Sequence, residues 1–168
     1  DKDVENISIK PLEFTPTRIR SYSKKDGVND SKFDPREKGY MTGVRDQESL
    51  GICWTFAGNA TLESFLKLKG YGDFDLSEEH MRWWAKDNVY GWNIGDTQGS
   101  TNETSIGYFT SWLGPKLEKD IPYNGRVTRE NGAKKPANYD SASRLPYNVT
   151  GVINVAADKT SVKNAILK

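Results

Sequence analysis

The sequence predicts an α+β fold in which helical segments come first and strand structure follows. Apolar residues recur at helical spacing in three segments between residues 53 and 113, each with a start or stop signal. A run that is typical of a strand follows at Val149 to Val155, and another amphipathic stretch begins near Asp158 or Thr160. Helices and strands that are segregated along the chain, and do not alternate, favour α+β architecture.

The longest predicted helix begins at about Cys53 and ends before Gly70, a residue suited to a helix C-terminus. Small and apolar side chains share one face, and further apolar residues from Trp54 to Leu68 widen it. We therefore expect a largely buried helix. The residues of the predicted face are Cys53, Phe56, Ala57, Ala60 and Ser64.

A second helix is predicted to begin after Ser77, a favourable N-cap that two acidic residues follow. Leu76 is placed to pack against Met81 as a hydrophobic staple. A third helix should begin near Thr101 or Asn102 and pack on the first helix, ending before Gly114-Pro115. Its predicted apolar face consists of Ile106, Phe109, Trp112 and Leu113.

Composition limits the classes of partner. The 24 basic and 23 acidic residues nearly cancel, which leaves a net charge of +1 and no field that would attract nucleic acid or an anionic membrane. No apolar run approaches the roughly 20 residues that cross a bilayer. A single cysteine excludes an internal disulfide. We expect no metal site and no cofactor.

The cysteine lies where a thiol can act as a nucleophile. Unpaired N–H groups and the positive end of the dipole at a helix start favour the thiolate, and Cys53 takes that position. Gln47 lies six residues earlier, so its amide can donate to an oxyanion beside the thiol. Gly51 allows a tight turn between them.

The segment from Gly43 to Phe56 resembles the active-site segment of the papain family of cysteine peptidases. The resemblance extends to Phe33-Asp34-Pro35-Arg36, to Leu76-Ser77-Glu78-Glu79 and to residues 114–123, and it covers about residues 31–168. We therefore expect a peptidase domain over 31–168 and, over 1–30, an arm, spacer or pro-segment remnant.

The resemblance implies the helical left lobe of a two-lobed papain-like fold, with the start of the β-rich right lobe. It makes Cys53 the nucleophile and Gln47 the oxyanion donor, helped by the backbone N–H of Cys53. Trp54 would pack beside the site, and Gly99-Ser100 would form the cleft wall that binds an extended peptide. The substrate-contacting residues that it implies are Gly51, Trp54, Gly99 and Ser100.

Two departures from the family pattern concern stability and specificity. Leu50 stands where the family usually has a disulfide-forming cysteine, which fits bacterial members better than plant or lysosomal ones. Ser100 replaces the second glycine of the cleft wall and adds a side chain where substrate approaches. With these departures the sequence resembles exported or surface cysteine peptidases of bacteria. We therefore expect a secreted or cell-surface protein whose substrates include cell-surface proteins.

A third departure concerns the catalytic base. The family's histidine and asparagine lie about 130–150 residues beyond the cysteine, or at roughly 183–203 here. They would belong to the remaining right-lobe segment of the parent, so we expect residues 1–168 alone to be inactive or nearly so. His80 matches no catalytic position of the family, and we interpret it as a surface or capping residue.

The resemblance implies a cysteine endopeptidase that works through a thioester on Cys53. Two alternatives stay open: a papain-fold binding or scaffold module without catalysis, and a papain-fold thiol amidase that acts on other amides. We interpret the cluster Trp83, Trp84 and Trp92 as core packing and not as a sugar-binding platform. Asn-X-Ser/Thr patterns such as the one at Asn59 are attributed to chance, because Asn59 falls within a helix.

Overall fold

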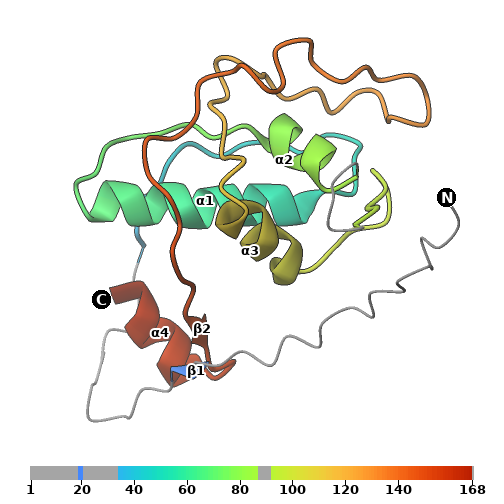
Figure 1. Ribbon diagram of the computed structural model, residues 1–168. Coiled ribbons are helices and arrows are strands. Elements are labelled where there is room, and N and C mark those ends of the chain that lie inside the picture. The colour runs from blue at the N-terminus through green and yellow to red at the C-terminus, as the bar shows by residue number, and fades with distance from the viewer. Residues whose placement is uncertain (1–18, 21–33, 87–91, 168) are drawn as a thin grey trace, which may run out of the picture. The chain divides into compact units, whose positions relative to one another are not determined.

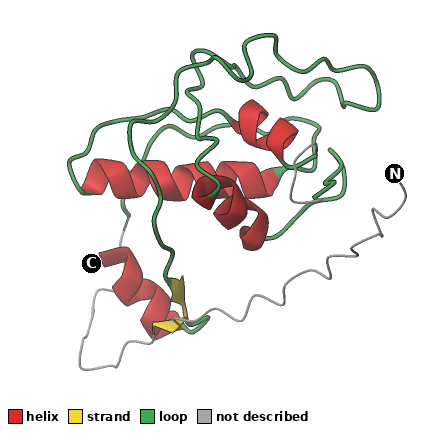
Figure 2. Cartoon of the chain, in the orientation of Figure 1, coloured by secondary structure: helices red, strands yellow, loops and turns green. Residues whose placement is uncertain are grey.

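The structure is a computed structural model, and it describes residues 19–20, 34–86 and 92–167. Figure 1 shows its elements in chain order, and Figure 2 shows that long loops connect them. By its contacts the chain divides into two units, one within residues 32–152 and one that joins the region of β1 to residues 153–168. The predicted arm over 1–30 lies outside the described residues except for β1. The elements are β1 (Ile19–Arg20), α1 (Cys53–Leu68), α2 (Glu78–Trp84), α3 (Asn102–Thr110), β2 (Asn154–Val155) and α4 (Lys159–Leu167).

Helix α1 is the central element of the larger unit, and both α2 and α3 pack against it. Its predicted bounds are confirmed. At the C-terminal end Gly70 adopts a φ of 73°, and its N–H donates to the carbonyl of Lys67 while the N–H of Tyr71 reaches that of Leu66. A left-handed residue of this kind satisfies the free carbonyls of the last turn.

The predicted buried face of α1 is wrong. Cys53, Ala57 and Thr61, spaced four residues apart, form an exposed line along the helix. The buried side instead carries polar residues whose partners lie across the core: the amide of Asn59 donates to the carbonyl of Leu76 at 3.0 Å, and Glu63 accepts the N–H of Leu76 at 2.7 Å. Buried polar groups are tolerated when they are hydrogen-bonded in this way.

Helix α2 begins as predicted, because the Ser77 hydroxyl accepts the N–H of His80 at 3.0 Å. All seven of its residues are buried. The staple is not borne out as predicted: Leu76 belongs to a cluster with Leu66 and Leu145, whereas Met81 belongs to the aromatic cluster. The hydrophobic contacts of α2 are therefore distributed over two cores.

His80 is not a surface residue, contrary to expectation. Its side chain is only 2% exposed, its ring stacks on Tyr139 with centroids 4.1 Å apart, and Nδ1 lies 2.6 Å from the hydroxyl of Tyr108. Burial lowers the pKa of His80 to about 3, with Lys116 and Lys135 adding to the shift. The imidazole is therefore a neutral core group.

Helix α3 packs on α1 as predicted but ends earlier. The Ser111 hydroxyl donates to the carbonyl of Tyr108 at 2.7 Å, and Trp112 adopts a φ of 60°, which stops the helix after Thr110. Trp112 and Leu113 therefore lie outside the helix, 49% and 54% exposed. The buried residues of α3 are Thr104, Ser105, Tyr108 and Phe109, so only Phe109 of the predicted face is buried.

The tryptophan cluster is confirmed as packing. Trp83 and Trp84 are buried in the aromatic core, and Trp92 packs against it with its ring edge-on to Trp84 at 5.2 Å. Residues 124–147 contain no helix or strand and form the long excursion that Figure 1 draws in orange. Two residues of this loop, Tyr139 and Leu145, are nevertheless buried.

The second unit contains the predicted strand in a shorter form. β2 pairs with β1 in parallel, with Ile19 opposite Asn154 and Arg20 opposite Val155. Helix α4 follows, and the carboxylate of Asp158 accepts the N–H of Ser161 at 2.9 Å, which confirms the predicted cap. Among the described residues no helix has the length and apolar character that crossing a membrane requires.

Candidate active site

Cys53 is the first residue of α1, and its side chain is exposed and free of any disulfide. The preceding residue, Ile52, is buried and provides no side-chain cap. Its carbonyl accepts both the N–H and the hydroxyl of Thr55, each at 2.9 Å, which fixes the first turn. The thiol is thus open to solvent at the end of the helix where backbone N–H groups lack helical partners.

Gln47 lies in the loop before this turn and is half-buried. Its amide nitrogen donates to the carbonyl of Leu50 at 2.7 Å, and its backbone carbonyl accepts the hydroxyl of Tyr123 at 2.6 Å. A carboxamide nitrogen carries two hydrogens, so one bond to Leu50 orients the group and leaves a second donor. The loop therefore presents a fixed amide close in sequence to the thiol.

Gly51 is in close contact with a segment from a distant part of the sequence. Its N–H donates to the carbonyl of Asp96 at 2.7 Å, and its own carbonyl accepts the N–H of Gly99 at 3.1 Å. A Cβ at this position would lie 3.0 Å from the carbonyl carbon of Thr97. Glycine is therefore required here because backbone fills the space that a side chain would take.

The remaining residues of the predicted site follow the two segments that meet at Gly51: Trp54 follows the turn, and Gly99 and Ser100 follow Thr97. Gly99 adopts a φ of 68°, a conformation that favours glycine, although the space around it is open. The hydroxyl of Ser100 lies 2.6 Å from that of Thr104, so it is engaged with the first turn of α3. Trp54 is buried, and its carbonyl accepts the hydroxyl of Ser105 at 3.1 Å.

A buried ionic cluster supports this region, and the sequence pattern does not predict it. Asp96 is completely buried and receives a two-pronged bond from Arg82, at 2.9 and 2.6 Å. The guanidinium of Arg129 lies 2.7 Å from the same carboxylate, and the backbone N–H of Arg129 donates to that carboxylate at 2.6 Å. These bonds hold the pKa of Asp96 below its usual value even though burial opposes the shift. Arg82 also pairs with Glu79.

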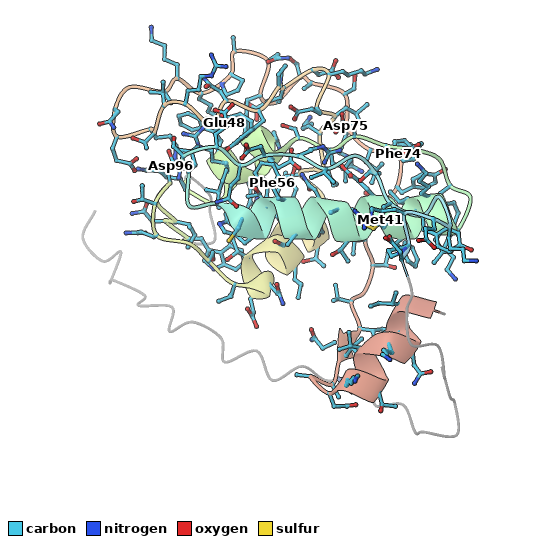
Figure 3. All side chains as sticks on the ribbon, turned by 180° about the vertical axis from the view of Figure 1, so that it is seen from behind. Met41, Glu48, Phe56, Phe74, Asp75 and Asp96 are labelled. Carbon is cyan, nitrogen blue, oxygen red and sulfur yellow. The ribbon has the colours of Figure 1, made fainter. Side chains whose placement is uncertain are left out.

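Figure 3 shows how these features lie along α1. Asp96 and Glu48 are placed near the end of the helix where Cys53 begins it, and Phe56 lies on its first turns. Met41 and Phe74 lie toward the other end, where they help to line a separate shallow pocket. Cys53 and Trp54 begin α1 at this end, and the backbone of Gly99 is bonded to Gly51 just before it.

The structure places the only histidine of the sequence away from solvent, whereas the thiol is exposed. His80 has its ring occupied by Tyr108 and Tyr139 and is not available to the thiol as a base. Within the described residues no group of three or more potential metal ligands is present. An exposed thiol at a helix start, with a glutamine in the loop that leads to it, is typical of hydrolases that use cysteine as nucleophile.

Comparison with protein families identifies the family of the chain. Residues 29–168 match the model described as papain family cysteine protease, so the chain belongs to the papain family. Cysteine proteinase 2 of Entamoeba histolytica is 32% identical over 148 residues, which is 80% of this chain and 45% of that protein. Human cathepsin O is 32% identical over 123 residues, 71% of this chain and 34% of that protein. The chain thus spans less than half of these relatives.

Solved structures confirm the predicted papain-like α+β fold. The cysteine protease and lectin-like domains of Cwp84, a surface layer associated protein of Clostridium difficile, match with 53% identity and a TM-score of 0.75. The match covers 80% of this chain and 29% of the Cwp84 chain. A mite allergen structure at 22% identity, with a TM-score of 0.67, covers 95% of this chain and shows the fold alone. The largely helical chain corresponds to the left lobe.

Proposed function

We propose that the protein containing this chain is a cysteine endopeptidase in which Cys53 is the nucleophile. The observation that carries the proposal is the exposed thiol of Cys53 at the first position of α1, with the amide of Gln47 oriented by Leu50 in the preceding loop. Membership of the papain family supports the same chemistry. We assign the wall of the substrate cleft to Gly99-Ser100.

The proposed reaction uses each of these groups in turn. The Cys53 thiolate attacks the carbonyl carbon of the scissile peptide, and the carbonyl electrons move to oxygen to form an oxyanion. The N–H of Cys53 and the amide of Gln47 donate to that oxygen. When the intermediate collapses, the C–N bond breaks, the amine leaves with a proton from the base, and a thioester remains. Water then hydrolyses the thioester and regenerates the thiol.

The base must come from residues other than His80. The sequence holds one histidine, and that side chain is buried and neutral in the aromatic core. A thiol at a helix start retains the contribution of the helix to its activation but lacks an imidazole to take and return the proton. We therefore propose that the right-lobe segment supplies the histidine, and that residues 1–168 alone hydrolyse peptides little or not at all.

The first test compares peptide turnover by the whole protein and by its Cys53→Ala variant. We expect hydrolysis of a peptide mixture by the wild type and its loss, by about three orders of magnitude or more, in the variant. Thr61→Ala is a matched control, because Thr61 lies two turns further along the same exposed line of α1. A folded wild type that cleaves no peptide would support the scaffold alternative instead.

The amidase alternative is separated by substrate class. The proposed cleft wall at Gly99-Ser100 favours a peptide, because main-chain groups of a cleft wall can pair with the backbone of an extended substrate. We expect peptides to be hydrolysed faster than simple conjugated amides by the same enzyme. Faster hydrolysis of non-peptide amides, with Cys53 still required, would identify a thiol amidase on the same fold.

We also propose that the protein acts at a bacterial cell surface, on surface proteins. Support comes from Cwp84, which is described as a surface layer associated protein and is 53% identical over the matched part. Fractionation of the producing cells, followed by immunodetection, tests this placement. We expect the protein in the cell-wall or culture fraction, and its confinement to the cytoplasmic fraction would overturn the proposal.

A further inference from the structure

We propose that Asp96 is a positioning residue for the active site. Two arginines hold its side chain, and this fixes the backbone of Asp96. That backbone in turn keeps the Gly51–Cys53 turn aligned with the segment 97–100, which contains the proposed cleft wall. This inference rests on the proposed cysteine peptidase function. It adds a residue that touches neither substrate nor the thiol, and that lies 43 positions after Cys53 in the sequence.

Asp96 is immobilised from both sides. Its carboxylate is completely buried, accepts two hydrogen bonds from Arg82 and one from the backbone N–H of Arg129, and forms an ion pair with the Arg129 side chain at 2.7 Å. Charge-assisted and two-pronged bonds of this kind fix geometry as well as charge. Asp96 therefore has a single defined position relative to α2, the helix that contains Arg82.

The arginines are themselves anchored to the core. Arg82 donates to the carbonyls of Asn124 and Val127, at 3.0 and 2.8 Å, and pairs with Glu79. Arg129 donates to the carbonyls of Arg82 and Ile94, at 2.8 and 2.6 Å. The cluster thus joins α2, the segment that begins at Ile94 and part of the long loop into one buried unit.

Backbone hydrogen bonds connect this buried unit to the proposed active site. The carbonyl of Asp96 accepts the N–H of Gly51 at 2.7 Å, and the N–H of Gly99 returns a bond to the carbonyl of Gly51 at 3.1 Å. Gly51 and Thr97 are in such close contact that no Cβ fits between them. A displacement of Asp96 is therefore passed to Gly51, two residues before Cys53, and to the wall.

The role differs from a purely structural one in what it predicts. Loss of folded protein lowers the number of active sites but leaves kcat and KM per site unchanged. Loss of register moves the N–H of Cys53 away from the oxyanion position and shifts the wall, which lowers kcat and raises KM at every site. Active-site titration with a thiol-directed epoxide separates the two effects.

The test uses the whole protein with Asp96→Asn, which keeps the backbone and the size of the side chain but removes its charge. We expect kcat/KM per titrated site to fall by about tenfold or more, with contributions from both constants, since small displacements at a site are costly. Glu130→Gln is the matched control, because Glu130 is next to Arg129 in the sequence but pairs with Lys86 on the surface. The kcat/KM per titrated site of this variant should stay within about twofold of the wild-type value.

Unchanged kcat and KM per titrated site in a folded Asp96→Asn variant would overturn the inference. If that variant does not fold, Arg129→Lys provides the same test, because it keeps a charge near Asp96 but loses the bonds to the carbonyls of Arg82 and Ile94. We expect a fall of about threefold or more there, and wild-type constants would contradict the inference. A wild type that neither titrates nor cleaves would instead refute the proposed function.

Discussion

The side-chain amide of Gln47 donates to the carbonyl oxygen of Leu50 at 2.7 Å, within the turn that leads to Cys53. This bond orients the carboxamide of Gln47, which lies four residues before Gly51. A preorganised donor stabilises a developing oxyanion more than a mobile one, because no reorganisation is needed during the reaction. The relationship explains how a loop residue can serve a site that is built on a helix.

Replacing Gln47 should therefore lower the rate of the chemical step. We expect Gln47→Ala to reduce kcat by about 10²–10³, the usual cost of one oxyanion donor, while KM changes little. Gln47→Glu, of similar size but without donors when ionised, should be at least as slow. Steady-state kinetics on a peptide substrate measure both. Unaltered kcat in both variants would show that Gln47 does not contact the oxyanion.

Replacing Gly51 should disturb the contact between the turn and the wall. The Cβ of Gly51→Ala would lie within about 3 Å of the backbone of Thr97, which cannot rotate away as a side chain does. We expect a loss of about 1–3 kcal/mol of unfolding free energy and a fall of about tenfold or more in kcat/KM. Chemical denaturation and peptide kinetics provide the two measurements.

Gly43→Ala is the matched control for that variant. A Cβ at Gly43 meets nothing within 4 Å, and the residue does not adopt a left-handed conformation. We expect activity within about twofold of wild type and stability that is equal or slightly higher, since alanine restricts the unfolded chain. Equal effects of the two substitutions would contradict the close contact between Gly51 and Thr97.

His80 should make the fold sensitive to acid. Its pKa is about 3 in the folded protein and near 6.5 when unfolded, so the unfolded chain binds more protons between these values. The stability that neutral His80 provides is complete above pH 6.5 and is lost as the pH falls toward 3. We expect a contribution of about 2–3 kcal/mol to be lost by pH 4.5. Unfolding free energies of wild type and His80→Phe, measured against pH, should converge on acidification.

Glu78 should act in the opposite direction. It is completely buried on α2 beside Arg45 and Glu63, and burial raises its pKa to about 7 despite the attraction of Arg45. The folded protein therefore binds a proton more readily than the unfolded chain, whose value lies near 4.5. The resulting stability is complete below pH 4.5 and is lost as the pH rises through 7.

The difference between wild type and Glu78→Gln isolates this effect. We expect the stability of the variant, relative to wild type, to increase between pH 5 and 8 by on the order of 3 kcal/mol. The change is measured as the pH dependence of urea unfolding in both proteins. A constant difference over this range would mean that Glu78 stays ionised throughout.

Local signals in the sequence were sufficient to place the helices. Ser77 as a cap and Gly70 as a terminator act within one turn, so their effects can be recognised without knowledge of the fold. The nucleophile and its amide donor could also be proposed from sequence, since Gln47, Gly51 and Cys53 lie in one short segment. The structure adds a backbone bond from Gly99 to Gly51 that the sequence does not specify.

The errors have a common physical cause. Asn59 and Glu63 interrupt the apolar pattern of α1, yet they are buried because the backbone of Leu76 satisfies them. His80 is polar and follows a cap, yet it is buried because α2 is enclosed by packing on every side. In each case a distant part of the chain provides the partner, and helical periodicity does not contain that information.

The same reason hid the cluster around Asp96. Its members come from α2, from the segment after residue 92 and from the loop at 129, and each charge taken alone is typical of a solvated surface. Only their convergence shows that they form a buried network. A single sequence therefore indicates the proposed nucleophile, Cys53, more readily than the residues that hold it in place.

The central claim, that Cys53 is the nucleophile, is tested most directly by labelling the whole protein with a thiol-directed epoxide and locating the label by peptide mass spectrometry. We predict one label on Cys53 and a loss of peptide hydrolysis in proportion to labelling, with competing peptide substrate slowing both. Peptide hydrolysis that persists after Cys53 is fully labelled, or in the Cys53→Ala variant, would contradict the claim.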